Sequence, residues 1–490
     1  MTLQDYHPKS NGKVSFPTAN VYSLWRQQGL AVVRLRDGDS PPPEQLVQAI
    51  WCHQRLRRDA LRLTDGRRLR ILHPGFWNHA AGPDFRNAVI QIESEPPRSG
   101  DIEVDLVAQG WRAHGHEQNP AYAQVVLHVV WDTPKEPAAM PTLVLRDVLD
   151  APLAELALWL GSDGARDLPQ ELMGRCRAPL RDLSEDARAD LLRQAAMVRL
   201  QSKAAQLDAR AREAGWEQAL WEGLLRALGY KNNVWPLQRI GEVMRFPNSQ
   251  PKAVPVMAWQ SRLLGVSGLL PTDLTRQLVV TDEYLRRVWE HWWRERDAFT
   301  EFALPRAVWR LSGLRPANHP QRRLALAAHW LAGSDLPTRL EQWFTTAQPR
   351  EKLADSLLAT LQPPLDDYWS WHWTLNSARM PRPQPLLGVT RVTDIAVNIV
   401  LPWLWIRAAA GKNEALRRAA EERYFAWPAG EDNAVLRLAR QRLLGGAPRR
   451  SLDSAAAQQG LLQIVRDFCD HSNALCENCR FPELVRALGK

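Results

Sequence analysis

The stretch "GPDFRNAVIQIESEPPRSGDIEVDL" (residues 82–106) contains two runs with the composition of β-strands, and Glu95-Pro96-Pro97 separates them. Acidic residues stand where such strands are normally apolar: Asp84 opens the first run, and Glu103 and Asp105 lie in the second. A carboxylate is costly to bury unless something neutralises it, and a divalent cation is one such partner. The stretch therefore predicts two neighbouring strands and raises the question of a metal site.

The sequence on either side predicts a mixed α/β domain. Residues 44–56 have apolar positions near helical spacing after three prolines, and Asp65-Gly66 separates two short apolar runs, which is a hairpin signal. A polar segment at 109–124 precedes "VVLHVVW" (125–131), an apolar run typical of a strand buried on both faces. The order is helix, three-strand meander, short helical segment and buried strand, which predicts a mixed sheet.

The remainder of the chain is helical in pattern. Residues 151–180 are transitional, and helical periodicity dominates from 181 to 490, beginning with the long run "LSEDARADLLRQAAMVRLQSKAAQLDARAREAGW". No fixed repeat period is visible, so a solenoid is not supported. We expect an α/β domain at 1–150, a linker at 151–180 and a large all-α region at 181–490, which forms one helical domain or two.

Composition favours a soluble, basic, Trp-rich protein. The net charge is +9, nine of the 63 basic residues are Lys, and 22 residues are Trp. Arginine suits bidentate contact with phosphate, so nucleic acid is the candidate partner, although many basic proteins bind none. The Trp residues indicate either a well-packed amphipathic helical interior or an unusual stacking surface.

No membrane association or export is expected. Residues 1–20 lack a continuous apolar core, and the longest apolar run, "IAVNIVLPWLWI" (395–406), is interrupted by Asn398 and Pro402. That run indicates a buried helix. Five cysteines in a long chain indicate a reducing, cytoplasmic setting in which metal ligation is favoured over disulfides.

Strand geometry brings the three carboxylates together. Glu103 and Asp105 are two residues apart and project to one face, while Asp84 begins the neighbouring strand about 5 Å away. The three side chains can then share one Mg²⁺ or Mn²⁺ ion, which would activate water and neutralise a scissile phosphate. The alternative is that Asp84 forms a turn and the other two lie on a solvated sheet face.

Three histidines are candidate catalytic residues. In "WRAHGH" (111–116), Gly115 allows a sharp turn, so His114 and His116 can face one site and donate a proton to a leaving oxygen. They are equally compatible with a surface loop. His128 lies within the predicted strand 125–131 and is either a satisfied core histidine or a site residue.

An arginine cluster lies beside the predicted meander. Seven arginines fall within residues 55–70, and the candidates for contact with a phosphate backbone are Arg55, Arg58, Arg67, Arg68 and Arg70. The alternative is a solvated helix end followed by an exposed hairpin.

Cysteines near the C-terminus have metal-ligand spacing. Cys469, Cys476 and Cys479 form C-x6-C-x2-C, in which the last two thiolates can reach one metal. A fourth ligand can come from Cys176 or His471, and we prefer Cys176 because it would tie the linker to the C-terminal helices. Four thiolates fit a structural Zn²⁺ or a [4Fe–4S] cluster; the alternative is free buried thiols.

Two resemblances to known families follow from these residues. Pro83-Asp84, followed by Glu103-x-Asp105 in the predicted order of elements, resembles the PD-(D/E)xK nuclease superfamily, with its restriction-endonuclease-like fold. The resemblance implies that Asp84 and Glu103 bind Mg²⁺ and that Glu44 matches a helix glutamate found in some members. The third motif position is Asp105 in place of Lys, and no Lys occurs between Lys13 and Lys135.

Over most of its length the chain also resembles the DUF2851 family of uncharacterised bacterial proteins. The motifs are "HPGFWNHAAGPDFRNAVI" (73–90), "GDIEVDL" with "GWRAHGHEQNPAYAQVVLHVVW" (within 100–131), "LGYKNNVWPL" (228–237), "LRPANHPQRRLA" (314–325) and "CDHSNALCENC" (469–479). This resemblance implies no known activity. The leading hypothesis is a metal-dependent nuclease or phosphodiesterase acting on DNA or RNA. The alternatives are a nucleic-acid-binding or scaffolding protein with a degenerate nuclease core, and a helical protein–protein adaptor.

Overall fold

The computed structural model describes most of the chain and divides it into two compact units. The described residues are 20–30, 41–78, 82–113, 115–134, 140–160, 174–230, 232–244, 254–271, 283–333, 335–445, 452–469, 476 and 479–488. Ser15–Ala205 and Ala429–Lys490 form one unit, called here the sheet unit, and Gln206–Pro428 form the helical unit. The boundary lies inside the long helix α6 (Glu185–Ala214), so the C-terminal helices belong with the sheet unit and not with the helices that precede them.

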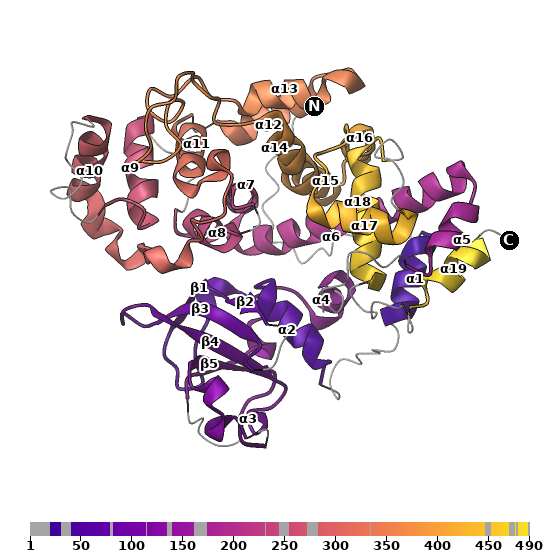
Figure 1. The fold of residues 1–490 in the computed structure, drawn as a ribbon, viewed down its shortest axis with the longest axis horizontal. Helices are drawn as coiled ribbons and strands as arrows, with labels where there is room; N and C mark the ends of the chain where they lie inside the picture. Colours follow the sequence, from indigo (N-terminus) through magenta and orange to yellow (C-terminus); the bar gives the residue numbers. More distant parts are fainter. Residues whose placement is uncertain are drawn as a thin grey trace. The chain divides into compact units, whose positions relative to one another are not determined.

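The sheet unit contains a mixed sheet, as the sequence predicts (Figure 1). Its strands are β1 (Leu69–His73), β2 (Phe76–Trp77), β3 (Phe85–Ile92), β4 (Arg98–Asp105), β5 (Val125–Val130) and β6 (Thr142–Val144). Strands β1, β3 and β4 form an antiparallel meander, and β2 also pairs with β3. Strand β5 is parallel to β4, and β6 is parallel to β5, so the sheet order is β1-β3-β4-β5-β6.

The turn predicted at Asp65-Gly66 forms, but the first of the two strands predicted around it does not. The Asp65-Gly66 turn is closed by a hydrogen bond from the Leu63 amide to the Arg67 carbonyl. The residues before the turn pair with those after it through a single isolated β-bridge, between Arg62 and Arg68. Between β4 and β5 the chain forms the short helices α3 (Gly110–Ala113), η2 (His116–Gln118) and η3 (Pro120–Tyr122). These helices supply the crossover that a parallel pair of strands requires.

Two helices pack on the sheet and complete its apolar core. Helix α2 (Glu44–Cys52) buries Val47, Ile50 and Trp51 against strand residues such as Phe85, while α4 (Leu153–Leu160) contributes Leu156 and Leu160. Prolines precede α2 and Glu44 lies in its first turn, an arrangement that suits a helix N-terminus. The packing places the first turns of α2 beside the start of β3.

A second core in the sheet unit is formed entirely by helices. Its elements are α1 (Val21–Leu30), α5 (Arg177–Asp182), the first part of α6, α17 (Ala434–Leu444), α18 (Ala455–Ile464), the π-helical turn Val465–Cys469 and α19 (Phe481–Leu488). Asp467 accepts hydrogen bonds from Tyr22 and Arg26, so α1 is held to the end of α18 by buried polar contacts as well as apolar packing.

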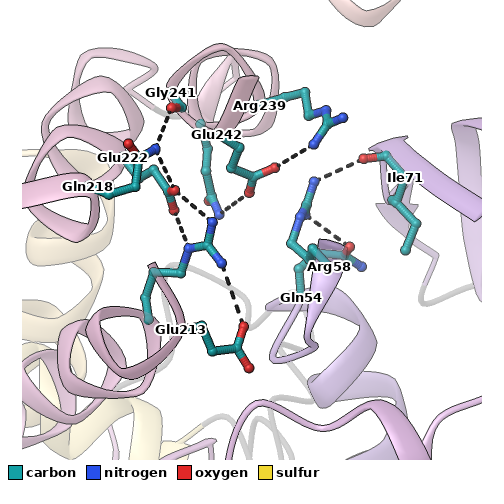
Figure 2. Close-up of polar contacts among 11 residues, drawn as sticks. Gln54, Arg58, Ile71, Glu213, Gln218, Glu222, Arg239, Gly241 and Glu242 are labelled. Carbon is teal, nitrogen blue, oxygen red and sulfur yellow. Dashed lines mark hydrogen bonds and ion pairs between the residues drawn. The ribbon is translucent and has the colours of Figure 1, made fainter. Parts of the chain in front are cut away.

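The helical unit consists of packed helices of ordinary length. They are α7 (Trp216–Leu228), α8 (Val234–Val243), α9 (Val256–Val266), α10 (Glu283–Glu295), α11 (Pro320–Ala332), α12 (Leu336–Thr345), α13 (Leu353–Leu361), α14 (Val389–Ile395), the π-helical turn Ala396–Val400, α15 (Leu401–Ala410) and α16 (Glu414–Ala426). Figure 2 shows a polar cluster here: Gln218 donates to the Gly241 carbonyl and to Glu222, which also accepts two bonds from Arg210.

Tryptophan side chains fill much of the helical interior. Trp369, Trp403, Trp405 and Trp427 are fully buried, as expected for a Trp-rich packed core. The continuous helical stretch Val389–Ala410 is long and apolar enough to cross a membrane, and 78% of its most apolar window is buried inside the protein. Such burial is typical of a core helix, in agreement with the buried helix that the sequence at 395–406 predicts.

Candidate metal centre

The acidic residues of the opening stretch lie at the junction of β3, β4 and α2. Glu103 and Asp105 alternate along β4 and project to the same face. Phe85 pairs with Ile102, which places Asp84, one residue before β3, beside Glu103. Asp101, two residues earlier in β4, is compensated separately by the Asn87 amide at 3.0 Å and is therefore not part of this junction.

Hydrogen bonds hold Asp84 in place. Its Oδ1 accepts a bond of 3.0 Å from Gln48 Nε2, and its Oδ2 accepts a bond of 3.1 Å from the Val104 amide. The Asp84 amide in turn donates to Glu103 Oε2 over 3.2 Å, and Gln48 also donates to Glu44 on α2. Asp84 therefore links α2 to β4 and orients the Glu103 carboxylate.

The buried residues Glu103, Asp105 and His116 form a group that can hold a metal ion. One ligand atom from each lies within 4.8 Å of the others, and this is the one such group among the residues that the structure describes. His116 Nε2 is 3.4 Å from Glu103 Oε1. Asp84 is not a member of this group, although its amide donates to Glu103; His116 joins the two β4 carboxylates within that distance.

The β4–β5 crossover places His116 at this site. Gly115 precedes η2 with a φ of 70°, in the left-handed region, which gives the sharp turn that the sequence predicts at this glycine. The His116 ring stacks on Tyr122 with centroids 3.9 Å apart, and Trp111 lies edge-on at 5.4 Å. His114, the other candidate in this segment, lies outside the described residues.

Asp105 is held on two sides. His128 Nε2 lies 2.9 Å from its Oδ2, and both side chains are buried. On the other side, a Cβ added to Gly110 would lie 2.7 Å from Asp105 Oδ1, a distance at which something would have to move. His128 therefore orients the Asp105 carboxylate, and Gly110 leaves room for it.

Burial and the charges of neighbouring carboxylates raise the pKa values of Asp84 and Glu103. Burial, opposed by the Val104 amide bond and reinforced by the nearby Glu44 charge, raises the pKa of Asp84 to about 7. Burial and the neighbouring Asp84 and Asp105 charges raise the pKa of Glu103 to about 8. A cation bound among these oxygens would remove the repulsion, as metal ions do at crowded carboxylate sites.

The predicted arginine cluster divides into buried and exposed members. Arg55 is buried and pairs with Asp150 at 2.8 Å, and Arg70 is also buried. Figure 2 shows Arg58 directed at Gln54 and at the Ile71 carbonyl. Arg67 is more than two-fifths exposed and pairs with Asp65, and Arg68 is exposed, so the Arg67–Arg68 end of the hairpin is the part that faces solvent.

Of the four cysteine candidates, Cys176 and Cys469 belong to the helical core of the sheet unit, and Cys479 packs against it. Cys176, Cys469 and Cys476 are buried, Cys479 is half-buried, and none of these four residues forms a disulfide. Arg442 donates to the sulfur of Cys476 over 3.2 Å. His471 lies outside the described residues.

Sequence reasoning missed three residues of the site. Gln48 lies four residues after Glu44 on the same helix face, a signal that could have identified it once Glu44 was considered. Tyr122 has no sequence signal, because its stacking on His116 depends on the path of the crossover. Gly110 likewise depends on its contact with Asp105.

The fold and the site define a protein with a mixed-sheet unit that carries a buried carboxylate–histidine group, joined to a large helical region. The chain belongs to the DUF2851 family, described as a protein of unknown function, whose model matches residues 44–433. No curated protein and no solved structure matches the chain.

Proposed function

We propose that this protein is a metal-dependent phosphodiesterase that acts on nucleic acid. The observation that carries the proposal is the buried group of Glu103, Asp105 and His116, whose ligand atoms lie within 4.8 Å of one another. Carboxylates suit Mg²⁺ and Mn²⁺, and an imidazole adds preference for a transition-metal ion, so Mn²⁺ is the natural first test. A cation bound there would activate water and neutralise charge on a scissile phosphate.

The surrounding residues would position the metal ligands. His128 fixes one oxygen of Asp105, and the Asp84 amide fixes one oxygen of Glu103. Tyr122 and Trp111 hold the His116 ring by stacking and edge contact. Such supporting contacts orient ligands and tune their basicity at known metal centres.

The order of elements supports placing this site with PD-(D/E)xK-like nucleases. The chain runs from helix α2 through the β1-β3-β4 meander and the helical crossover to the parallel strand β5. This is the order of elements on which the resemblance to that superfamily rests. Asp84 and Glu103 stand at the expected start of β3 and within β4. Asp105 stands at the position of the motif lysine. His116 is an additional site residue that the motif does not contain.

Nucleic acid is the favoured substrate class because of charge. The chain carries +9, and most of its basic residues are arginine. Arg67 and Arg68 are exposed on the hairpin that precedes β1, and the Arg86 side chain on β3 is about two-fifths exposed. Arginine side chains of this kind bind phosphate backbones without regard to sequence.

A second candidate is a nucleic-acid-binding protein with a non-catalytic core. The observation that favours it is that Asp84 and Asp105 are both satisfied by protein groups, Gln48 and the Val104 amide for the first and His128 for the second. Combined with the missing motif lysine, this arrangement is compatible with a site that binds without cleaving.

A cleavage assay separates the two candidates. Wild type, Glu103→Gln and Asp105→Asn are incubated with supercoiled plasmid, single-stranded DNA and single-stranded RNA in Mn²⁺ and in chelator. Glu95→Gln, which removes an exposed charge in the turn between β3 and β4, is the matched control. We expect Mn²⁺-dependent cleavage by wild type and Glu95→Gln, with at least a hundredfold loss in the other two.

Equal cleavage by all four proteins would mean that a contaminant is responsible, and no cleavage on any substrate would refute the catalytic proposal. In that second case, filter binding across a salt titration tests the non-catalytic alternative. Affinity that falls steeply with salt supports nucleic-acid binding, and no binding at low salt excludes it.

A further inference from the structure

A second cluster of metal-ligand side chains lies in the helical core of the sheet unit, apart from the carboxylate group. Cys176 precedes α5, and Cys476 and Cys479 precede α19. Helix α5 packs against both α17 and α19, so segments about 300 residues apart in the sequence meet here. The Arg175 guanidinium confirms this closeness, because it donates to the Cys476 carbonyl over 3.2 Å.

Three of the thiols lie close enough to influence one another electrostatically, although no three of the four cysteine sulfurs lie within 4.8 Å of one another. The pKa of Cys176 is raised to about 12, first by burial and then by the nearby thiols Cys479 and Cys476. The pKa of Cys479 is raised by burial and by Cys476 as well. Cys469, at the end of the π-helical turn after α18, is buried in the same apolar cluster as Cys176.

The backbone around these thiols is shaped for close approach. Gly174 donates to the Arg442 carbonyl over 2.9 Å, and a Cβ at Gly174 would lie 3.2 Å from the Cys176 sulfur. Cys476 has a φ of 56°, a left-handed conformation that is uncommon for a residue with a side chain. The Cys479 amide donates to the Cys476 carbonyl, closing the C-x-x-C turn directly before α19.

A positive charge is directed at one of the sulfurs. Arg442 on α17 is fully buried, and its guanidinium donates to Cys476 Sγ over 3.2 Å. Metal-bound sulfurs carry negative charge, and a buried guanidinium at hydrogen-bond distance would be a partner for that charge. Hydrogen bonds to ligating sulfurs from outside the ligand set also tune thiolate metal centres.

From this geometry we infer that Cys176, Cys476 and Cys479, with Cys469 in the fourth position, bind a thiophilic metal centre that joins α5 to the C-terminal helix α19. The chemistry is four-thiolate ligation. A [4Fe–4S] cluster, whose ligand sulfurs stand farther apart than those around a single ion, fits the present spacing of the sulfurs, whereas one Zn²⁺ would require them to move closer together. The role is structural: the metal fixes α5 and α19 to α17. It is independent of the carboxylate group and of the proposed phosphodiesterase activity.

Metal analysis of the full-length protein tests the inference. The protein is purified under reducing, oxygen-free conditions without added metal, and its zinc and iron are quantified beside its visible absorption spectrum. About one zinc per chain without visible absorption identifies the zinc form, and about four irons with broad visible absorption identify the cluster. Cys176→Ser and Cys476→Ser should lose the metal, whereas the matched control Cys52→Ser, at the end of α2, should keep it.

Two further measurements keep the outcome decisive. If the cysteine variants do not fold, wild type is titrated with a thiol reagent before and after chelation, and metal release should expose four additional reactive thiols. Glu103→Gln should keep the thiolate-bound metal in full, which separates this centre from the carboxylate group. The inference is overturned if native protein holds neither metal, binds no Co²⁺ on reconstitution, and shows the same thiol reactivity with and without chelator.

Discussion

Replacing Glu103 by Gln should stabilise the metal-free protein at alkaline pH while abolishing its response to metal. Glu103 is buried on β4 and its pKa is raised from 4.5 to about 8 by burial and by the Asp84 and Asp105 charges. A carboxyl whose pKa is higher in the folded than in the unfolded state binds more protons when folded. Its contribution to stability is therefore present below about pH 4.5 and is lost as pH rises towards 8.

The size of the effect follows from the same values. Each pH unit between the usual and the raised pKa corresponds to about 1.4 kcal/mol, and relaxation and water entry reduce the sum, so we expect about 1–3 kcal/mol at pH 9. The glutamine amide of the variant carries no charge to desolvate. The variant should therefore match wild type near pH 4 and exceed it at pH 9.

Urea unfolding at pH 4, 6 and 9, with and without Mn²⁺, measures this difference. Mn²⁺ at about 100 times its Kd should stabilise wild type by about 2.7 kcal/mol and leave Glu103→Gln unchanged. The exposed control Glu95→Gln should follow wild type throughout. A variant that is less stable than wild type at pH 9, or a difference that does not change with pH, would refute the reasoning.

Other predictions concern the groups that support the ligands. Gly110→Ala should lower Mn²⁺ affinity at least tenfold in calorimetric titration, because the new Cβ would lie 2.7 Å from Asp105 Oδ1. The control Gly388→Ala, which has nothing within 4 Å of its Cβ, should leave the affinity unchanged. Equal affinities of the two variants for Mn²⁺ would contradict the geometry. Gln48→Leu should raise the pKa of Asp84, because it removes a hydrogen bond that lowers this pKa; a carboxyl titration followed by NMR in which the pKa of Asp84 stays or falls would show that the bond is not formed. For wild type, Mn²⁺ affinity should rise between pH 6 and 9, because the Glu103 carboxyl, whose pKa is about 8, must release its proton to bind the ion; an affinity independent of pH would count against Glu103 as a ligand.

Much of the sheet could be predicted from local sequence. The period of two places Glu103 and Asp105 on one face wherever β4 lies, and Asp65-Gly66 specifies its own turn. The three-residue strand β6 was missed, because so short a segment carries no periodicity and is defined only by pairing with β5.

The composition of the site depended on long-range packing. His116 reaches Glu103 only because the crossover turns at Gly115 and stacks on Tyr122, and no local pattern encodes that path. The burial of Arg55 depends on Asp150, almost a hundred residues away, although the local sequence reads as an exposed basic stretch. Pattern reasoning identifies which side chains share a strand face, and tertiary contacts decide which of them meet.

The division into units has the same origin. Helical periodicity correctly indicates the long helix α6, but it contains no information about which helices pack against each half of that helix. Arg199 near the middle of α6 donates to Gln459 of α18, a contact between residues 260 apart. Contacts of this kind join the C-terminal helices to the sheet unit.

The most direct measurement is anomalous diffraction from crystals of the full-length protein grown with Mn²⁺. We expect one manganese peak within coordination distance of Glu103, Asp105 and His116, lost in crystals of Glu103→Gln. A Mn²⁺-containing crystal with no peak there, or with manganese bound only elsewhere, would contradict the existence of a metal centre at the junction of β3, β4 and α2.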